Sequence, residues 1–358
     1  MKHLSFIYLF FISLIVVSQS NTRAIITNSK TATATSYHIA DSLSHNDGPY
    51  IFIDKDTILE KNIINGNLEI KTLGLNTIDT VFKDGPSIYY DISKIAAISD
   101  VHGQYGLTLR ILINNHIIDE KLNWTFGKGH LVIVGDIFDR GPKVTELLWF
   151  VYNLEREAET KGGKVHFLLG NHEYMVMQND LRYINKKYRL TSKLLKTPYY
   201  ALYGKETVLG RWLRSKATIL KIDDNLFVHG GISKEFIANG FNLEETNQRM
   251  RQSLNEDENE PTWHTLYNPY YGNNGPIWYR GYFSGDFKKK DVNNLLRKLD
   301  VKHIIVGHTS QNQIESLFHN KILAIDSSIK NGVYGEILFI ENGSYYRGTM
   351  EGEKIKLN

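Results

Sequence analysis

Short apolar runs alternate with longer segments of helical spacing along much of the chain, beginning at Lys94. The runs IAAIS, LVIV and VHFLL have strand length, and the spacing between them predicts helices near residues 104–118 and 143–161. Two further apolar runs, LFV and HIIV, follow later in the chain. Strand-length and helix-length segments in alternation are typical of an α/β fold with a central sheet.

The segment before Lys94 has a different pattern. Residues 48–93 alternate between apolar and polar positions, and two β-like runs flank Asn65-Gly66. An Asn-Gly pair between such runs predicts a β-hairpin, so we expect a small N-terminal β-rich element. Residues 21–47 are rich in Thr, Ser, Asn and Ala, which predicts a flexible linker.

Residues 174–224 interrupt the α/β rhythm with a long, basic and Tyr-rich stretch of helical spacing. We interpret this stretch as a helical insert within a domain that covers residues 94–350. Because aromatic side chains dominate protein cores, we expect its tyrosines to pack in the interior rather than stack on substrate. They are Tyr183, Tyr188, Tyr199, Tyr200 and Tyr203.

The first twenty residues resemble a secretory signal peptide. Lys2 precedes an apolar run from Leu4 to Val17, and the small residues Ser18 and Ser20 follow as a cleavage site requires. The run is shorter than the ~20 residues that a spanning helix needs, so we expect no stable membrane insertion after cleavage. The sequence therefore predicts an exported, periplasmic or secreted protein. Its many Asn, Ile, Lys and Tyr residues indicate an AT-rich, bacterial genome.

Composition narrows the range of functions. The 358 residues are 42% hydrophobic and 23% charged, as in ordinary globular proteins. The formal net charge of +3 gives no reason to expect a nucleic-acid partner or an anionic membrane surface. The sequence contains no cysteine, which excludes disulfides, thiolate metal sites and the cysteine nucleophile of ordinary tyrosine phosphatases.

Each of the five apolar runs leads into side chains that bind metals or phosphate. In chain order these are Asp100 and His102, then Asp136, Asp139 and Arg140, then Asn171 and His172, then His229, and last His308. In open α/β sheets, ligands bind at the carboxyl ends of the strands. We therefore expect five separate segments to deliver these groups to one site.

Asp, His and Asn are ligands that suit Mn, Fe or Zn, and their number exceeds what one tetrahedral site requires. We expect two metal ions, the first held by Asp100 and His102, with Asp136 as a bridge. The second ion would be held by Asn171, His229 and His308. Two such ions stabilise the attacking and leaving oxygens of a displacement at phosphorus, and a water bridging them would supply the hydroxide nucleophile.

The remaining polar residues fit the other needs of phosphate ester hydrolysis. We expect His172 to protonate the leaving oxygen and Asp139 to hold its ring in the correct tautomer. His172 as a plain metal ligand is the alternative. Arg140 and Arg280 are predicted to bind the phosphoryl oxygens, because Arg forms paired hydrogen bonds with them. Asn171 is predicted to bind the substrate phosphate as well as a metal ion. Glu173 is expected to hold a loop rather than to take part in the reaction.

The blocks DVHG, GDIFDRG, GNHE, HGG and GHT resemble those of the calcineurin-like metallophosphoesterases, and most closely the phosphoprotein phosphatase branch. The resemblance covers roughly residues 94–340 and implies a two-sheet α/β/β/α sandwich with a dinuclear centre at one edge. The stretch WYRG around Arg280 resembles the Shewanella-like, bacterial-type phosphatases. That branch is associated with phosphotyrosine, so the resemblance implies a phosphorylated protein, peptide or small phosphomonoester as substrate.

The sequence departs from the eukaryotic serine/threonine members after the last expected ligand. Those enzymes carry a Ser-Ala-Pro-Asn-Tyr-Cys-like block, whereas this chain has AIDSSIKNG, which argues against serine/threonine specificity. Two alternatives to a monoesterase stay open. One is a phosphodiesterase or dinucleoside polyphosphate hydrolase, and the other is a catalytically inactive surface binding module.

Overall fold

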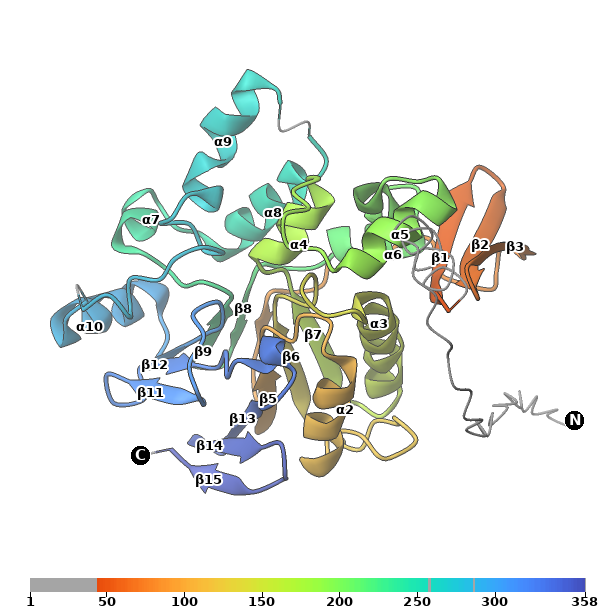
Figure 1. Cartoon of the computed structure of the whole chain (residues 1–358). Coiled ribbons are helices and arrows are strands. Elements are labelled where there is room, and N and C mark those ends of the chain that lie inside the picture. Colours follow the sequence, from red (N-terminus) through yellow and green to blue (C-terminus); the bar gives the residue numbers. More distant parts are fainter. Residues whose placement is uncertain (1–43, 257–258, 286, 358) are drawn as a thin grey trace, which may run out of the picture. The chain divides into compact units, whose positions relative to one another are not determined.

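The computed structural model describes residues 44–256, 259–285 and 287–357, which belong to one compact unit (Figure 1). The predicted signal peptide, and the predicted linker up to residue 43, lie outside the described residues. Among the helices of the described part of the chain, none combines the length and apolar character that a membrane crossing requires.

Two six-stranded sheets form the body of the unit. The first has the order β15-β14-β13-β5-β6-β7, with bounds Lys354–Lys356, Ser344–Thr349, Glu336–Glu341, Lys94–Ile98, His130–Val134 and Lys164–Leu168. The second has the order β11-β12-β10-β9-β8-β4, with bounds Glu315–Leu317, Ile322–Ala324, His303–Val306, Asn225–Val228, Ile219–Ile222 and Ile88–Tyr89. The central strands β5, β6 and β7 run parallel, as do β9, β10 and β12. The five predicted strands are therefore confirmed.

The two sheets pack face to face through alternate residues of their strands. Ile95, Ala97 and Val132 of the first sheet share a buried cluster with Phe227 and Ile305 of the second. Because successive side chains of a strand point to opposite faces, the residues between these positions face outward. Those outward residues are apolar as well, which means that each sheet is covered on both faces.

Helices cover the outer faces. α2 (Tyr105–Asn114) and α3 (Val144–Thr160) pack on the first sheet, where Ile111 and Leu148 join a cluster with Ala96 and Leu131. α7 (Lys234–Ala238) and α10 (Lys289–Leu299) cover the second sheet. The arrangement is the predicted α/β/β/α sandwich, and the helices predicted near 104–118 and 143–161 are confirmed (Figure 1).

A three-stranded sheet precedes the sandwich. Its strands are β1 (Asp47–Asp54), β2 (Thr57–Ile64) and β3 (Asn67–Leu73), and the predicted hairpin at Asn65-Gly66 joins β2 to β3. Polar contacts attach this sheet to α3 and α5 (Lys186–Leu195). The indole nitrogen of Trp149 donates to Pro49 O at 2.8 Å, and Lys187 Nζ lies 3.0 Å from Asp47 Oδ1.

Residues 171–222 contain α4 (Asn171–Met177), α5 (Lys186–Leu195), the 3-10 turn η1 (Tyr199–Tyr203), α6 (Val208–Arg214) and the strand β8. The predicted helical insert thus ends in a strand, because β8 pairs with β9 and buries Ile219, Leu220 and Ile222. Tyr188, Tyr199 and Tyr203 are buried as predicted. Tyr183 and Tyr200 differ, since 42% and 38% of their surfaces are exposed.

Two more helices, α8 (Leu243–Ser253) and α9 (Pro261–Tyr271), follow α7, and a short 3-10 turn, η2 (Ile329–Asn331), precedes β13. Asn247 of α8 joins the sheet to the helix layer. Its Oδ1 accepts from the backbone N–H groups of Thr218 and Ile219, at 2.8 and 2.9 Å.

Candidate metal centre

The carboxyl ends of β5, β6, β7, β9 and β10 meet at one edge of the sandwich, and the loops that follow them bring the predicted residues together. Parallel pairing aligns these strand ends, as in other sheets that bind ligands at this edge. The loops approach closely because small residues lie between them. A Cβ on Gly170 would lie 2.3 Å from Asp136 Oδ1, and one on Gly307 would lie 2.5 Å from Asp100 Oδ2.

Asp136 lies at the centre of the arrangement. Its Oδ2 is 3.2 Å from His229 Nε2, 3.5 Å from His102 Nε2 and 3.8 Å from His172 Nε2. Its Oδ1 accepts a hydrogen bond from the backbone N–H of His172 at 3.1 Å. One oxygen therefore faces imidazoles from three different loops, which is where a bridging carboxylate would have to lie.

Asp100 and Asn171 extend the cluster on either side. Asp100 Oδ1 lies 3.9 Å from His102 Nε2, while its Oδ2 accepts from Ser99 Oγ at 2.5 Å and from the His308 N–H at 2.9 Å. Asn171 Oδ1 lies 2.9 Å from His229 Nε2. The structure thus brings together every residue that the sequence predicted as a metal ligand.

Two sets of donor atoms share Asp136, and within each set the donor atoms lie within 4.8 Å of one another. One contains His102, Asp136 and His172, and the other contains Asp136, His229 and His308. All five side chains are buried. Two adjacent donor sets that share a carboxylate are what two neighbouring cations would need. Because His172 belongs to the first set, its position also agrees with the alternative prediction that it is a metal ligand.

Hydrogen bonds to the backbone fix which imidazole nitrogen faces the centre. His102 Nδ1 lies 2.6 Å from Phe138 O, and His229 Nδ1 lies 2.7 Å from Val134 O. Both rings would donate from Nδ1 and leave Nε2 as the ligand atom. His308 Nε2 is buried and has no hydrogen-bond partner among the described residues. A buried nitrogen without a partner is costly, and a cation would satisfy it, so the residues fit a metal.

The charge state of the cluster also favours cations. Burial lowers the pKa of His102 to about 3 and that of His308 to about 2, so both rings are neutral. Burial opposes charge on His229 as well, but Asp136 and Asp100 raise its pKa to about 10. The two carboxylates therefore keep a proton on His229 at the centre of the site. A metal ion bound there can take the place of that proton.

The backbone at these loop ends is strained. The left-handed region is unfavourable for residues other than glycine, and such residues gather at functional sites. Here the conformation occurs at Asp100, His102, Asp136, Asp139, Arg140 and His308, with φ between 42° and 72°. The strained backbone therefore occurs at the residues whose side chains turn toward the cluster.

His172 and Asp139 form a pair beside the cluster. His172 Nδ1 lies 2.5 Å from Asp139 Oδ2, which leaves Nε2 pointing toward Asp136. Burial would lower the pKa of His172, but the two carboxylates raise it above its usual value. The ring is therefore oriented and biased toward its protonated form, as the predicted proton donor requires.

The two predicted phosphate-binding arginines are exposed at the mouth of the site. Arg280 Nη1 donates to His308 O at 2.8 Å and to Thr309 Oγ1 at 3.2 Å. Arg140 lies over the ring of Tyr183, with 5.4 Å between its guanidinium carbon and the ring centroid. Both guanidinium groups are thus tethered next to the cluster.

Glu173 holds two of the loops in place, as the sequence predicted. Its carboxylate accepts from the backbone N–H groups of Asp136, Ile137, Phe138 and Gly170, at 2.7 to 3.2 Å. The side chain is fully buried. It fixes the backbone on both sides of the cluster without facing its centre.

Sequence reasoning missed Asp326, which lies close enough to Asp100 to raise the pKa of that residue, after burial itself. Asp326 is buried, and its Oδ2 accepts from Ser310 Oγ at 2.5 Å. Its signal is present in the sequence, because it closely follows the apolar run of β12, which lies beside β10. The stretch AIDSSIKNG, which contains Asp326, stands out in the sequence only by its difference from the serine/threonine branch.

Comparisons with known proteins agree with this geometry. The model of the family described as calcineurin-like phosphoesterase matches residues 93–312. The solved structure of a cold-active protein-tyrosine phosphatase from a psychrophilic Shewanella species is 41% identical, with a TM-score of 0.83, and the match covers 87% of this chain and 99% of that one.

Two curated proteins extend the comparison. Shewanella-like protein phosphatase 2 of Arabidopsis thaliana is 30% identical over 67% of this chain and 72% of its own length. Shewanella-like protein phosphatase 1 of Plasmodium berghei is 26% identical over 85% of this chain and 81% of its own length. The chain therefore belongs to the calcineurin-like phosphoesterase family, as an enzyme of the phosphatase branch that includes the Shewanella-like proteins.

Proposed function

We propose that this enzyme is a phosphomonoesterase with two metal ions and that phosphotyrosine in proteins or peptides is its substrate. The observation that carries the proposal is the pair of buried donor sets that share Asp136. The similarity to a solved protein-tyrosine phosphatase supports the choice of substrate.

In this proposal, one ion would be held by Asp100, His102 and Asp136. The second ion would be held by Asn171, His229 and His308, together with Asp136. The donor types suit Mn, Fe or Zn. A metal pair held by these residues would supply Lewis acidity and would lower the pKa of a water molecule used as nucleophile.

The side chains around the metal ligands would carry out the remaining tasks. Arg140 and Arg280 bind the phosphoryl oxygens, because both guanidinium groups are exposed beside the donor sets. His172 donates a proton to the leaving oxygen from Nε2, and Asp139 keeps the proton on Nδ1. Water attacks phosphorus directly, so no covalent phospho-enzyme forms, and the absence of cysteine from the sequence agrees with this route.

Tyr183 supports an aromatic leaving group. Its ring is 42% exposed and lies 5.4 Å from the ring of His172. Its backbone O accepts from the Arg140 N–H at 3.0 Å, and Asn185 Nδ2 donates to Arg140 O at 2.7 Å, so the loop that carries it is fixed to the site. An exposed ring beside the proton donor can stack on the phenyl group of phosphotyrosine.

A substrate panel tests the proposed reaction. The metal-replete enzyme should hydrolyse p-nitrophenyl phosphate in preference to bis-p-nitrophenyl phosphate and diadenosine tetraphosphate. Preference for the diester or the polyphosphate would identify the alternative hydrolase classes. Absence of activity with both Mn and Zn supplied would favour the inactive binding module. Metal analysis should give two ions per chain.

A matched pair of variants tests the role of Tyr183. The Tyr183→Leu variant should lower kcat/KM for a phosphotyrosine peptide about 2- to 13-fold relative to a phosphoserine peptide, because one stacking contact is worth about 0.5–1.5 kcal/mol. Tyr200→Leu removes a similarly exposed tyrosine of the same insert and should leave the ratio unchanged. An equal loss on both peptides would contradict the stacking role and leave the phosphatase assignment standing.

We also propose export, with residues 1–20 as a cleaved signal peptide, residues 21–43 as a linker, and a phosphatase domain that contains residues 94–350 together with the edge strands β4 and β15. Residues 44–47 of the predicted linker are excluded, because His45 Nε2 lies 2.9 Å from Thr191 Oγ1 and β1 begins at Asp47. The apolar run that ends at Val17 supports this organisation. Amino-terminal sequencing of protein purified from the periplasm or medium should begin at Asn21. Recovery of the intact chain from the cytoplasm alone would contradict export.

A further inference from the structure

The strand β3 forms one edge of the three-stranded N-terminal sheet, and no other strand of the described residues pairs with its outer side (Figure 1). Its residues from Asn67 to Thr72 are all exposed to solvent. They include the apolar side chains of Leu68 and Ile70, with 39% and 57% of their surfaces exposed. An exposed edge strand presents unpaired N–H and C=O groups, so it can pair with a strand of another chain.

The opposite edge of the same sheet is covered by the chain itself. The N–H of Ile53 in β1 donates to Glu206 O at 2.8 Å, and Phe52 pairs with Thr207 in antiparallel orientation. Within the described residues, β3 makes no backbone hydrogen bond of this kind on its outer side. The two edges of this sheet therefore differ, and β3 is the one open to a partner.

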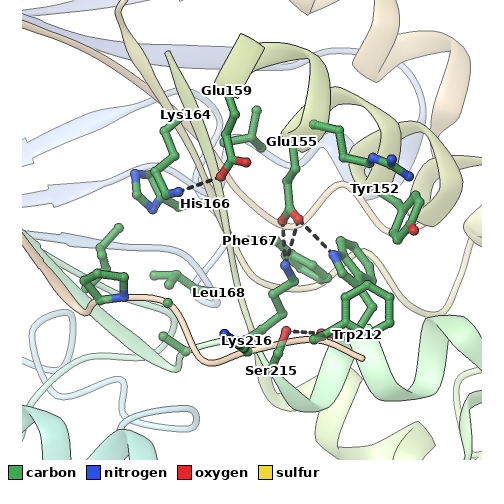
Figure 2. Close-up of a pocket in the computed structure, with 18 of the residues that line it drawn as sticks. Tyr152, Glu155, Glu159, Lys164, His166, Phe167, Leu168, Trp212, Ser215 and Lys216 are labelled. Atoms are coloured by element: carbon green, nitrogen blue, oxygen red, sulfur yellow. Dashed lines mark hydrogen bonds and ion pairs between the residues drawn. The ribbon is translucent and has the colours of Figure 1, made fainter. Parts of the chain in front are cut away.

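The coil that follows β3 is fixed to the sandwich and does not cover this edge. Residues 79–86 line a cavity of about 320 Å³ beside α3 and α6 (Figure 2). Phe82 packs edge to face against Tyr152 of α3, with 6.1 Å between the ring centroids. Arg211 of α6 donates from Nη1 to Thr80 O at 3.1 Å. These contacts hold the coil against the two helices.

The turn before β3 determines which backbone groups of the strand face outward. The turn Asn65-Gly66 has two positive φ values, 49° and 76°, and in a two-residue turn of this kind the flanking residues form a hydrogen-bonded pair. Hydrogen-bonded and non-hydrogen-bonded positions alternate along an antiparallel pair. The N–H and C=O groups of Leu68, Ile70 and Thr72 therefore point away from β2.

The sequence of β3 is complementary to itself when two copies run antiparallel. Pairing centred on Ile70 would place Glu69 of each copy opposite Lys71 of the other, and Leu68 opposite Thr72. Glu69 and Lys71 would occupy non-hydrogen-bonded positions, where opposite side chains approach most closely. Opposite charges in such positions stabilise the pairing of two strands.

The same two charges disfavour the neighbouring registers. Pairing centred on Glu69 would place the two copies of Glu69 opposite each other, and pairing centred on Lys71 would do the same for the two lysines. Like charges directly opposite one another destabilise a sheet. The charges on β3 therefore select the register centred on Ile70.

We propose that β3 is a self-association surface and that two copies of this chain pair through it, antiparallel and centred on Ile70. The outward N–H and C=O groups of Leu68, Ile70 and Thr72 would bond to those of Thr72, Ile70 and Leu68 of the second copy. The two N-terminal sheets would become one continuous antiparallel sheet. No candidate residue of the metal centre belongs to this sheet, so association should leave kcat per chain unchanged.

Sedimentation equilibrium of the metal-replete full chain tests the proposal. An edge of seven residues is small beside the ~1,200–2,000 Å² that stable specific interfaces bury, so we expect a dimer with a Kd on the order of 100 μM. Glu69→Lys and Lys71→Glu should each weaken association about tenfold, because each sets like charges opposite one another at both ends of the pairing. Added salt should weaken the parent dimer, because it screens exposed ion pairs.

Two combinations of these variants should restore association. The double variant, Glu69→Lys with Lys71→Glu, exchanges the charges and should associate as the parent does. An equimolar mixture of the two single variants should form a heterodimer at least as tight as the parent dimer, because a strand with two lysines then faces a strand with two glutamates.

Two controls separate this surface from other causes of association. Lys55→Glu reverses an exposed charge in the turn between β1 and β2 and should associate as the parent does. Every variant should keep the kcat of the parent for p-nitrophenyl phosphate, which shows that its fold is intact. A parent chain that stays monomeric at all concentrations would assign β3 to a different occupant and overturn the proposal. Normal association of both single variants, or a mixture no tighter than either variant alone, would overturn it as well.

Discussion

Replacement of Glu173 by glutamine tests how far the metal centre depends on a side chain that does not face it. Each carboxylate oxygen of Glu173 accepts two backbone N–H groups, those of Ile137 and Phe138 on Oε1 and those of Asp136 and Gly170 on Oε2. Glutamine keeps one oxygen and replaces the other by an amide NH2 group, which cannot accept. Two buried N–H groups would then lose their acceptor.

The expected loss of stability is large. Each unsatisfied buried donor costs about 1–3 kcal/mol, so Glu173→Gln should lower the free energy of unfolding by about 2–6 kcal/mol. Proteins of ordinary stability have only about 5–15 kcal/mol in total. Because either orientation of the amide disturbs the backbone between Asp136 and Phe138, the loop that carries the shared carboxylate should also loosen. We therefore expect weaker metal binding and a fall in kcat of at least tenfold.

Urea unfolding of the metal-free protein, followed by tryptophan fluorescence, measures the first effect. Glu157→Gln is the matched control, since Glu157 Oε1 accepts one backbone N–H, that of Trp124, at 3.0 Å near the surface. It should cost no more than about 1 kcal/mol. If Glu173→Gln unfolds within about 1 kcal/mol of the parent and retains its kcat, the reasoning about this carboxylate is wrong.

Three further predictions concern the site and its surroundings. Asp136→Asn should reduce bound metal by at least one ion per chain, measured by elemental analysis, because both donor sets contain Asp136; retention of both ions would contradict the shared role. His172→Asn should lower kcat for phosphoserine by about 10²–10⁴-fold but much less for p-nitrophenyl phosphate, whose leaving group needs no proton; equal losses would favour the ligand role. Burial lowers the pKa of His130 to about 4 and that of His166 well below its usual value, so the unfolded chain gains protons first as the pH falls below about 6.5. Stability should therefore decline with acidification, and His166→Gln should reduce the slope of unfolding free energy by about 1.4 kcal/mol per pH unit; an unchanged slope would contradict it.

Much of the fold and of the site follows from local patterns. Each predicted strand is a short apolar run, and each predicted ligand comes directly after one, so the parallel arrangement of β5, β6 and β7 was enough to bring Asp100, Asp136 and Asn171 together. The hairpin at Asn65-Gly66 was predictable for the same reason, because its turn chemistry is contained in two residues.

Other features depend on contacts between distant parts of the chain. The partners of the Glu173 carboxylate include backbone groups 35 to 37 residues earlier, which no local pattern reveals. The exposure of Tyr183 depends on the hydrogen bond between its own loop and Arg140.

The strand β4 has a practical consequence for protein engineering. It precedes residues 93–312, which match the family model, yet it forms the outermost strand of the second sheet and pairs with β8. The carboxylate of Asp223 accepts from the N–H groups of Asp91 and Ile92 at 2.7 and 3.1 Å, just after this strand. A chimera that joins the catalytic domain to another protein should therefore start upstream of Ile88, because a cut at residue 93, where the family-model match begins, would remove the edge strand of the second sheet.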